Sequence, residues 1–389
     1  MPTNYHNPRH KNSTLTTRLA CALLFLLFTF FWLYWFQADM LAVAQHGLSG
    51  GKTHYNRTVG ALIVTGVLLV LQFIVNAIIR LQRRTHALTY LPSFMLLAFV
   101  SGQSSPFTWG AWLWAGPLVL LVWVGLVVLS KKMLPFENDE KEYTGLFSRR
   151  VWVNLLQMTA MMLGVVAVNN TNAVDHYKAR AEVALVHGDV DRALRAGEFS
   201  HETDESLTML RAFALTQKGE LADRLFCYPV AGSSADLLPL AGSKSQLKLL
   251  ADSIIWDHFG LRPDSLVPFG SNVLTTVPDL DSLEHDSLAS FAYIDYRLMS
   301  LLVDRRLHSF VVSLPRHYVA EADSLPVHYR EALVLYQQRF DTLFIYDDSL
   351  MLERWNDYRS YDSIYPLPSE RKLRAEDLYM GTYWYYYDK

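Results

Sequence analysis

Long apolar runs in the first 170 positions constrain the fold of this chain more than any other feature. Residues 19–36, 58–79, 110–129 and 151–168 carry few polar groups. An α-helix needs about 20 such residues to cross a hydrocarbon core about 30 Å thick. Residues 87–102 form a shorter run that contains Pro92. We predict five transmembrane helices, at about 19–36, 58–79, 87–102, 110–129 and 151–168.

Basic residues are spread unevenly between the segments that flank these runs. With five crossings and the N-terminus inside, only Lys52 and Arg57 fall in the outer loops. The inner segments hold Arg9, Lys11, Arg18, Arg80, Arg83, Arg84, Lys131, Lys132, Lys141, Arg149 and Arg150. Without the third crossing, Lys131, Lys132, Arg149 and Arg150 would face outward, against the positive-inside bias. The pattern predicts a cytoplasmic tail (residues 1–18), a membrane domain (19–168) and an extracytoplasmic domain (172–389).

Polar residues within the runs occur in helical pairs. Gln72 and Asn76 are four residues apart, and Asn154 and Gln157 are three apart. Residues at these spacings share a helix face, so we expect them to form hydrogen bonds between helices. No Asp, Glu, Lys, Arg or His lies in the middle of a run. Pumps and coupled transporters usually need such groups, so this class is disfavoured.

The residue pattern in the second half of the chain predicts amphipathic helices. Residues 177–196 resemble a tetratricopeptide repeat (TPR), with Tyr177 at the large aromatic position and Ala181 at the small one. Residues 210–226 repeat the pattern, with Ala212 small and Gly219 at the turn. The resemblance implies paired helices and no chemistry. The sequence therefore predicts an all-α protein, in which a five-helix membrane bundle is followed by a TPR-like helical domain.

Short motifs in this half mark helix starts. Asp-Ser followed by Leu or Ile begins at Asp252, Asp264, Asp281, Asp286, Asp323, Asp348 and Asp362. A short acidic side chain before an apolar run is a helix N-cap signal. The sequence Leu-Pro-x-His-Tyr occurs twice, at residues 314–318 and 325–329. On one helix its histidines would lie about 16 Å apart, too far to share a metal. We interpret the repeat as two helix starts with the tyrosines packed inward.

Composition excludes several function classes. The formal net charge is −3, so nothing indicates nucleic acid as a partner. The two cysteines, Cys21 and Cys227, exclude a disulfide framework and a cysteine zinc site. Phosphate-loop, dinucleotide, serine-hydrolase and zinc-protease motifs do not occur, so we expect no catalytic motif, metal or cofactor.

One loop keeps an enzymatic alternative open. Asp39 follows the first run, and a short amphipathic segment, Gly50, Gly51 and Tyr55 come after it. This arrangement resembles the first periplasmic loop of GT-C-like membrane glycosyltransferases that use lipid-linked sugars. The resemblance implies a transfer role for an acidic residue at this position. Asp39 is therefore the candidate catalytic residue.

The chain also resembles an uncharacterised family of multi-pass membrane proteins from Bacteroidetes. The resemblance rests on AQHGLSGGKTHY, on the pattern around residues 325–333, and on the terminal TYWYYY. It implies a bacterial inner membrane with the helical domain in the periplasm. We expect a membrane-anchored scaffold that binds a protein partner and the lipid bilayer. Candidate interaction residues are His317, Tyr318, His328, Tyr329, Tyr383, Trp384 and Tyr385. We expect the aromatic tail to dock on the helical domain as an extended strand, or else at the membrane interface.

Overall fold

The computed structural model describes residues 8–81, 83–102, 109–133, 148–237, 248–259, 290–319, 324–340 and 344–389, and all regular secondary structure in these ranges is helical. This confirms the all-helical class. The chain forms two compact units, Met1–Asn172 and Ala173–Lys389.

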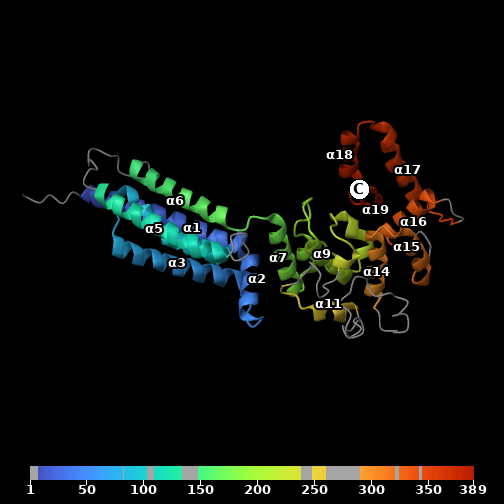
Figure 1. Ribbon diagram of the computed structural model, residues 1–389, viewed down its shortest axis with the longest axis horizontal. Helices are drawn as coiled ribbons and strands as arrows, with labels where there is room; N and C mark the ends of the chain where they lie inside the picture. Colours follow the sequence, from blue (N-terminus) through green and yellow to red (C-terminus); the bar gives the residue numbers. More distant parts are fainter. Residues whose placement is uncertain are drawn as a thin grey trace, which may run out of the picture. The chain divides into compact units, whose positions relative to one another are not determined.

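Among the described residues of the first unit, four stretches are long and apolar enough to cross a membrane. They are Leu15–Phe36, Arg57–Ile79, Gly110–Lys132 and Arg149–Val168. They belong to α1 (Pro8–Phe31) with the π-helical turn η1 (Trp32–Phe36), α3 (Arg57–Ile79), α5 (Trp109–Met133) and α6 (Arg149–Val168). Helix α1 packs against both α3 and α6, and the three run side by side in Figure 1. At most 28% of any apolar window is buried, so most of its side chains face outward. Such a surface suits lipid and is not stable in water.

The expected third crossing has a different local structure from the single helix that we predicted over 87–102. Arg83–Tyr90 forms a 3₁₀ helix, η2, and Leu91–Ser101 forms an eleven-residue α-helix, α4. Pro92 explains the boundary, because proline lacks the N–H of a helix interior but is tolerated in the first turn. At about 1.5 Å per residue, α4 alone covers only about 16 Å.

Polar groups from neighbouring helices bind this irregular segment. The Asn154 side chain accepts a hydrogen bond from the Ala87 amide at 2.7 Å, and Gln72 donates to Thr89 Oγ1 at 3.3 Å. Trp123 Nε1 donates to the Leu88 carbonyl at 2.8 Å. Gln72 and Asn154, one member of each predicted polar pair, therefore do join helices. They satisfy 3₁₀ backbone and side-chain groups that lipid would leave unpaired.

A twelve-residue helix, α2 (Ala38–Ser49), follows η1 and runs across the end of the bundle (Figure 1). Gly50 ends it with φ of 58°, a left-handed conformation that favours glycine. The short helical segment expected after the first apolar run is therefore present in the structure.

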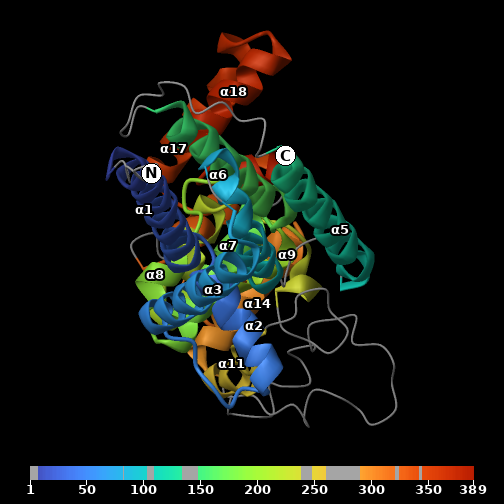
Figure 2. The ribbon, with the colours of Figure 1, turned by 90° about the vertical axis from the view of Figure 1, so that its left-hand side faces the viewer.

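The second unit is built from helices that pack mainly on their neighbours in the chain. Its longer elements are α7 (Ala173–Val186), α9 (Glu205–Lys218), α14 (Phe291–Val303), α16 (Val327–Arg339), α17 (Ser349–Ile364) and α18 (Pro368–Tyr379). Shorter ones are α8 (Val190–Leu194), α10 (Leu221–Arg224), η4 (Leu225–Cys227), η5 (Ser234–Asp236), α11 (Asp252–Phe259), α15 (Leu307–Ser313), η6 (Leu314–Arg316) and α19 (Tyr383–Asp388). The helices α17 and α18 contact each other and project together from the rest of this unit (Figures 1 and 2).

The two repeat-like stretches form consecutive helix pairs, α7 with α8 and α9 with α10. The residues expected at the small positions, Ala181 and Ala212, are 1% and 0% exposed. Gly219 ends α9 with φ of 69°, at the predicted turn. Tyr177 packs on Gly197, where an added Cβ would lie 2.5 Å from the ring. The second helices, α8 and α10, have only five and four residues, so each pair combines a long helix with a short one.

The aromatic tail lies on its own domain. Residues 383–388 form the short helix α19, and not the extended strand that we expected. Tyr383 and Trp384 are 0% and 1% exposed. The Trp384 indole donates to the Glu331 carbonyl at 2.7 Å, which fixes α19 against α16. A helix replaces a strand here because Thr382 caps it by accepting a hydrogen bond from the Tyr385 amide.

Candidate functional site

The two tyrosines of the repeated Leu-Pro-x-His-Tyr sequence converge on one carboxylate. The hydroxyl groups of Tyr318 and Tyr329 both donate to Asp295 Oδ1, which comes from α14. Their rings lie 5.5 Å apart in an edge-to-face arrangement. Burial raises the pKa of Asp295, and the two hydroxyl groups oppose that effect. This cluster joins α14, α16 and the segment after η6.

The two histidines of the repeat do not meet. His328 is 1% exposed, and its Nδ1 lies 2.9 Å from Glu331 Oε2. His317 ends η6, half-buried and outside this contact. Glu331 Oε2 also accepts the Tyr383 amide at 2.7 Å. Four of the seven candidate interaction residues, His328, Tyr329, Tyr383 and Trp384, are thus packed inside the domain.

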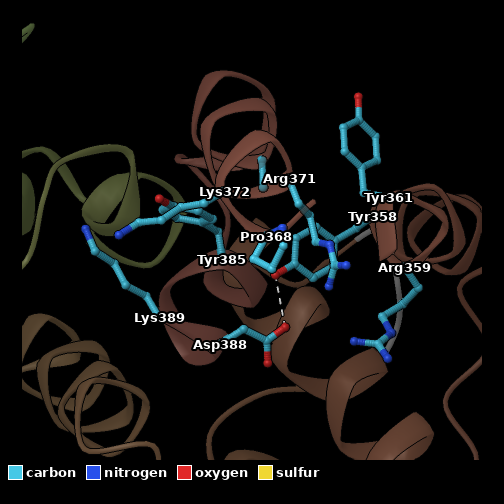
Figure 3. Close-up of a pocket in the computed structure, with 10 residues that line it drawn as sticks. Tyr358, Arg359, Tyr361, Pro368, Arg371, Lys372, Tyr385, Asp388 and Lys389 are labelled. Carbon is cyan, nitrogen blue, oxygen red and sulfur yellow. Dashed lines mark hydrogen bonds between the residues drawn. The ribbon is translucent and has the colours of Figure 1, made fainter. Parts of the chain in front are cut away.

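A pocket of about 510 Å³ lies between α17, α18 and α19. Its lining residues are Tyr358, Arg359, Tyr361, Pro368, Arg371, Lys372, Ala375, Tyr385, Asp388 and Lys389. Figure 3 shows Lys372 and Lys389 on one side, Arg359 on the other and Arg371 between them. Tyr385 is the one candidate interaction residue that lines this pocket.

The pocket carries an excess of positive charge. Four of its side chains are cationic and one, Asp388, is acidic. Asp388 is already engaged, because it accepts from the Tyr358 hydroxyl at 2.9 Å and lies 3.6 Å from Arg339. Arg371 donates to the Tyr365 and Pro366 carbonyl groups, which fixes the position of its guanidinium. An anionic group entering the pocket would meet several cations and three tyrosine rings.

Apolar side chains are exposed beside the pocket. Leu367 and Leu378 are 61% and 62% exposed. Leu367 is the N-cap residue of α18, and Leu378 lies in its last turn. No residue of α18 is buried. This helix therefore presents apolar and basic groups together, as protein-binding surfaces often do.

Asp39, the candidate catalytic residue, forms an ion pair. Its Oδ1 lies 2.9 Å from Arg57 Nη2, and its side chain is 9% exposed. The Arg57 guanidinium also lies over the Tyr34 ring, 5.6 Å from the ring centre. Asp39 lies in the first turn of α2 and Arg57 begins α3, so the pair joins two elements at one end of the bundle. Among the described residues, no group of three or more His, Cys, Asp or Glu could hold a metal ion.

The basic residues of the pocket were absent from our sequence-based candidates. Arg371 and Lys372 lie three and four residues after Pro368, which places all three on one helix face. That one-sided basic face is the signal in the sequence. Arg359 and Lys389 carry no comparable pattern, because they reach the pocket from other helices.

Comparison with known proteins gives one match. A family of unknown function (DUF6057) matches residues 274–389, which include α14 to α19 and all the residues that line the pocket. The chain is similar to that family over this region. No curated protein and no solved structure matches the chain.

Proposed function

We propose that the protein is a membrane-anchored binding protein whose helical domain captures an acidic segment of a partner protein in the α17–α19 pocket. The observation that carries this proposal is the pocket itself, with four cations and one carboxylate that already has partners. The exposed leucines of α18 favour a polypeptide over a small anion, because they offer apolar contacts next to the charged cavity.

Five crossings anchor the protein in this proposal. The segment that contains η2 and α4 runs parallel to α6. Ala87, near its start, binds Asn154, and Gly102, at its end, lies beside Asn169. The same segment also runs parallel to α1. Tyr90 packs against Phe25, and Ser101 accepts a hydrogen bond from Trp32 Nε1. Together η2 and α4 span about 32 Å, enough to cross the hydrocarbon core.

The directions of the helices also place basic residues together at one end of the bundle. Trp123 contacts Leu88 and Trp112 contacts Phe99, so α5 runs antiparallel to the third segment. Its C-terminal end therefore lies at the same end as the start of η2 and α6. This end holds Arg18, Arg80, Arg84, Lys131, Lys132, Arg149 and Arg150. A cytoplasmic location for it agrees with the positive-inside bias.

The helical domain would then lie in the periplasm of a bacterial inner membrane, as the sequence resemblance implies. The α7–α8 and α9–α10 pairs support a TPR-like start to that domain, with shortened second helices. Helical repeats stack into surfaces that bind peptides or partner subunits. The Arg57 ion pair and the low exposure of Asp39 leave little of its carboxylate for an acceptor, which disfavours the glycosyltransferase alternative.

The test uses the full chain in lipid nanodiscs and a fluorescein-labelled peptide of alternating Glu and Leu. We expect fluorescence anisotropy to show binding of this peptide and none of its Lys-for-Glu counterpart. Lys372→Glu should weaken binding about tenfold, since one reversed contact in such a site is worth about 1.4 kcal/mol. Arg374→Glu is the matched control, because Arg374 lies on the same helix outside the pocket lining.

Two outcomes would contradict the proposal. Equal affinities of the Lys372 and Arg374 variants would show that the pocket does not hold the acidic groups. Light scattering that shows a wild-type dimer, lost in Lys372→Glu, would identify a second copy of the chain as the occupant.

A further inference from the structure

The loop between α8 and α9 displays an aromatic side chain in solvent. Phe199, in this loop, is 93% exposed, a larger fraction than any other large apolar side chain that the structure describes. Single apolar residues are common on protein surfaces, so exposure alone defines no site. Two further observations distinguish Phe199. The loop is held in place from both ends, and it contacts α18, which forms one wall of the α17–α19 pocket.

A buried cation fixes the first part of this loop. Arg211 of α9 is 1% exposed, and its Nη2 donates to the Ala196 and Gly197 carbonyl groups at 3.3 and 2.8 Å. The Cζ atom of Arg211 lies 5.0 Å from the centre of the Tyr228 ring. A buried charge is costly unless it is hydrogen-bonded, so Arg211 and these two carbonyl groups hold one another in place.

Contacts with α7 fix the loop further. Gly197 has φ of 66°, and a Cβ there would lie 2.5 Å from the Tyr177 ring, so a larger residue does not fit. At the other end of the loop, Asp204 caps α9 and accepts from Lys178 Nζ at 2.7 Å. The loop therefore presents Phe199 without the ordering cost that a flexible loop bears on binding.

The loop lies beside the proposed binding pocket. His201 Nδ1 lies 3.5 Å from Glu376 Oε1 on α18. Glu376 is four residues after Lys372, which lines the pocket, so the two are neighbours on the helix surface. Phe199 is two residues before His201, at most about 7 Å along the chain. An extended polypeptide covers about 3.4 Å per residue, so a segment that leaves the pocket past Lys372 reaches the loop within a few residues.

Charges around the loop determine which residue of a ligand fits there. Glu198 and Glu202 lie on either side of Phe199 in the chain, and Glu376 adds a third carboxylate. These groups repel an acidic side chain, whereas an apolar side chain packs on the exposed ring without that cost. The loop therefore favours an apolar residue near the acidic residues that the pocket holds.

We infer that Phe199 is a second anchor of the binding site, and that the partner segment carries a large apolar residue a few positions from its acidic group. This inference rests on the proposed function, because the pocket must hold the acidic group for the neighbouring residue to reach the loop. The acidic group pairs with the cations of the pocket, and the apolar side chain packs against Phe199. Aromatic side chains are enriched at the centre of protein interfaces, in agreement with this role.

The test compares two kinds of fluorescein-labelled peptide on the full chain in lipid nanodiscs. Each has a run of alternating Glu and Gly and then a Gly-Ser linker of about three, five or seven residues. One kind ends in Trp and the other in Gly. At the best linker length, fluorescence anisotropy should show that the wild type binds the Trp peptide about tenfold more tightly, because an aromatic side chain becomes buried. Phe199→Ala should reduce this ratio to about twofold or less.

Two variants serve as controls for the tenfold ratio. Phe199→Leu keeps an apolar side chain and should retain most of it. Phe291→Ala removes an aromatic side chain that is 59% exposed on α14, outside the pocket lining, and should leave the ratio unchanged.

The outcomes separate this inference from the proposed function. If Lys372→Glu weakens binding of both peptides while Phe199→Ala keeps the tenfold ratio, the pocket holds acidic groups and Phe199 is not an anchor. Equal affinities of the wild type for the two peptides at every linker length would also overturn the inference. If neither peptide binds the wild type, the proposed function fails and the inference fails with it.

Discussion

Two copies of Leu-Pro-x-His-Tyr show how far one residue pattern determines its surroundings. The tyrosine has the same hydrogen-bond partner in both copies, since Tyr318 and Tyr329 both donate to Asp295. The histidines differ, because only the second copy continues into a long helix. There His328 lies in the first turn of α16, three residues before Glu331, and both side chains point inward. The inward packing of Tyr329 could be predicted from helical spacing, whereas the partner of His328 depended on what followed it.

The His328–Glu331 pair makes stability depend on pH. The pKa of His328 rises from an ordinary value of 6.5 to about 9 in the folded chain. A raised pKa means that the folded state holds the proton more tightly. The contribution is therefore complete below about pH 6.5 and disappears as pH rises through about 9. We expect the free energy of unfolding of the helical unit to fall by on the order of 3 kcal/mol across this range.

Urea denaturation of the full chain in detergent, at several pH values, measures this change. Glu331→Gln removes the carboxylate that favours the imidazolium, and should flatten the pH dependence while lowering stability at neutral pH. A wild-type stability that stays constant from about pH 6.5 to about pH 9 would show that the ring is neutral in the folded chain.

At the scale of helices, local signals located most elements but not their internal geometry. Asp348 caps α17, as the Asp-Ser-Leu pattern predicts, by accepting a hydrogen bond from the Met351 amide at 3.0 Å. Asp362 carries the same pattern but lies inside α17, because packing against α16 and α18 carries the helix past the local start signal. Asp252 begins α11. The patterns at Asp264, Asp281, Asp286 and Asp323 lie outside the described residues.

The third apolar segment shows the same limit. Its apolar character predicted a helix, but the sequence did not show that its first half would be 3₁₀. That geometry depends on a side chain 67 positions away, Asn154, which binds the Ala87 amide. The pocket was unpredictable for a similar reason, since its cations come from α17, from α18 and from the residue after α19, and no local pattern specifies how these segments pack.

Asn154→Leu tests the role of this contact. Leucine cannot accept the hydrogen bond from Ala87, and the unpaired buried amide should cost about 1–3 kcal/mol. Thermal unfolding of the full chain in detergent should show a lower midpoint for this variant. Gln157→Leu on the same helix is the control, because Gln157 Oε1 has no hydrogen-bond partner among the described residues. Equal midpoints for the two variants would mean that Asn154 does not support η2.

At the scale of the whole molecule, the number of crossings determines where the pocket lies. In the part of the chain that the structure describes, four helices are long enough to cross on their own, and an even number would leave both ends of the membrane unit on one side. The segment that contains η2 and α4 supplies the fifth crossing in our proposal. The positive-inside bias led to the same count from sequence, because charge distribution reports topology even where helix length does not.

Reporter fusions distinguish the two topologies. An enzyme active only outside the cytoplasm, fused after Asp175, should be active because an odd number of crossings precedes it. The same reporter fused after Glu140 should be silent. The reverse result for the Glu140 fusion would mean that the third segment does not cross, and the helical domain would then be assigned to the cytoplasm.

The packing of η2 also has a consequence for biogenesis. Among the described elements, η2 has its most extensive contacts with α6, which the ribosome makes later. Before α6 is synthesised, the Ala87 amide lacks its Asn154 partner, and the polar groups at the start of η2 would be unpaired in lipid. The segment is therefore expected to wait at the membrane surface or inside the insertion machinery while α5 and α6 are synthesised. Chains truncated before α6 should then be degraded faster than chains truncated after it, although both contain the complete η2 and α4 sequence.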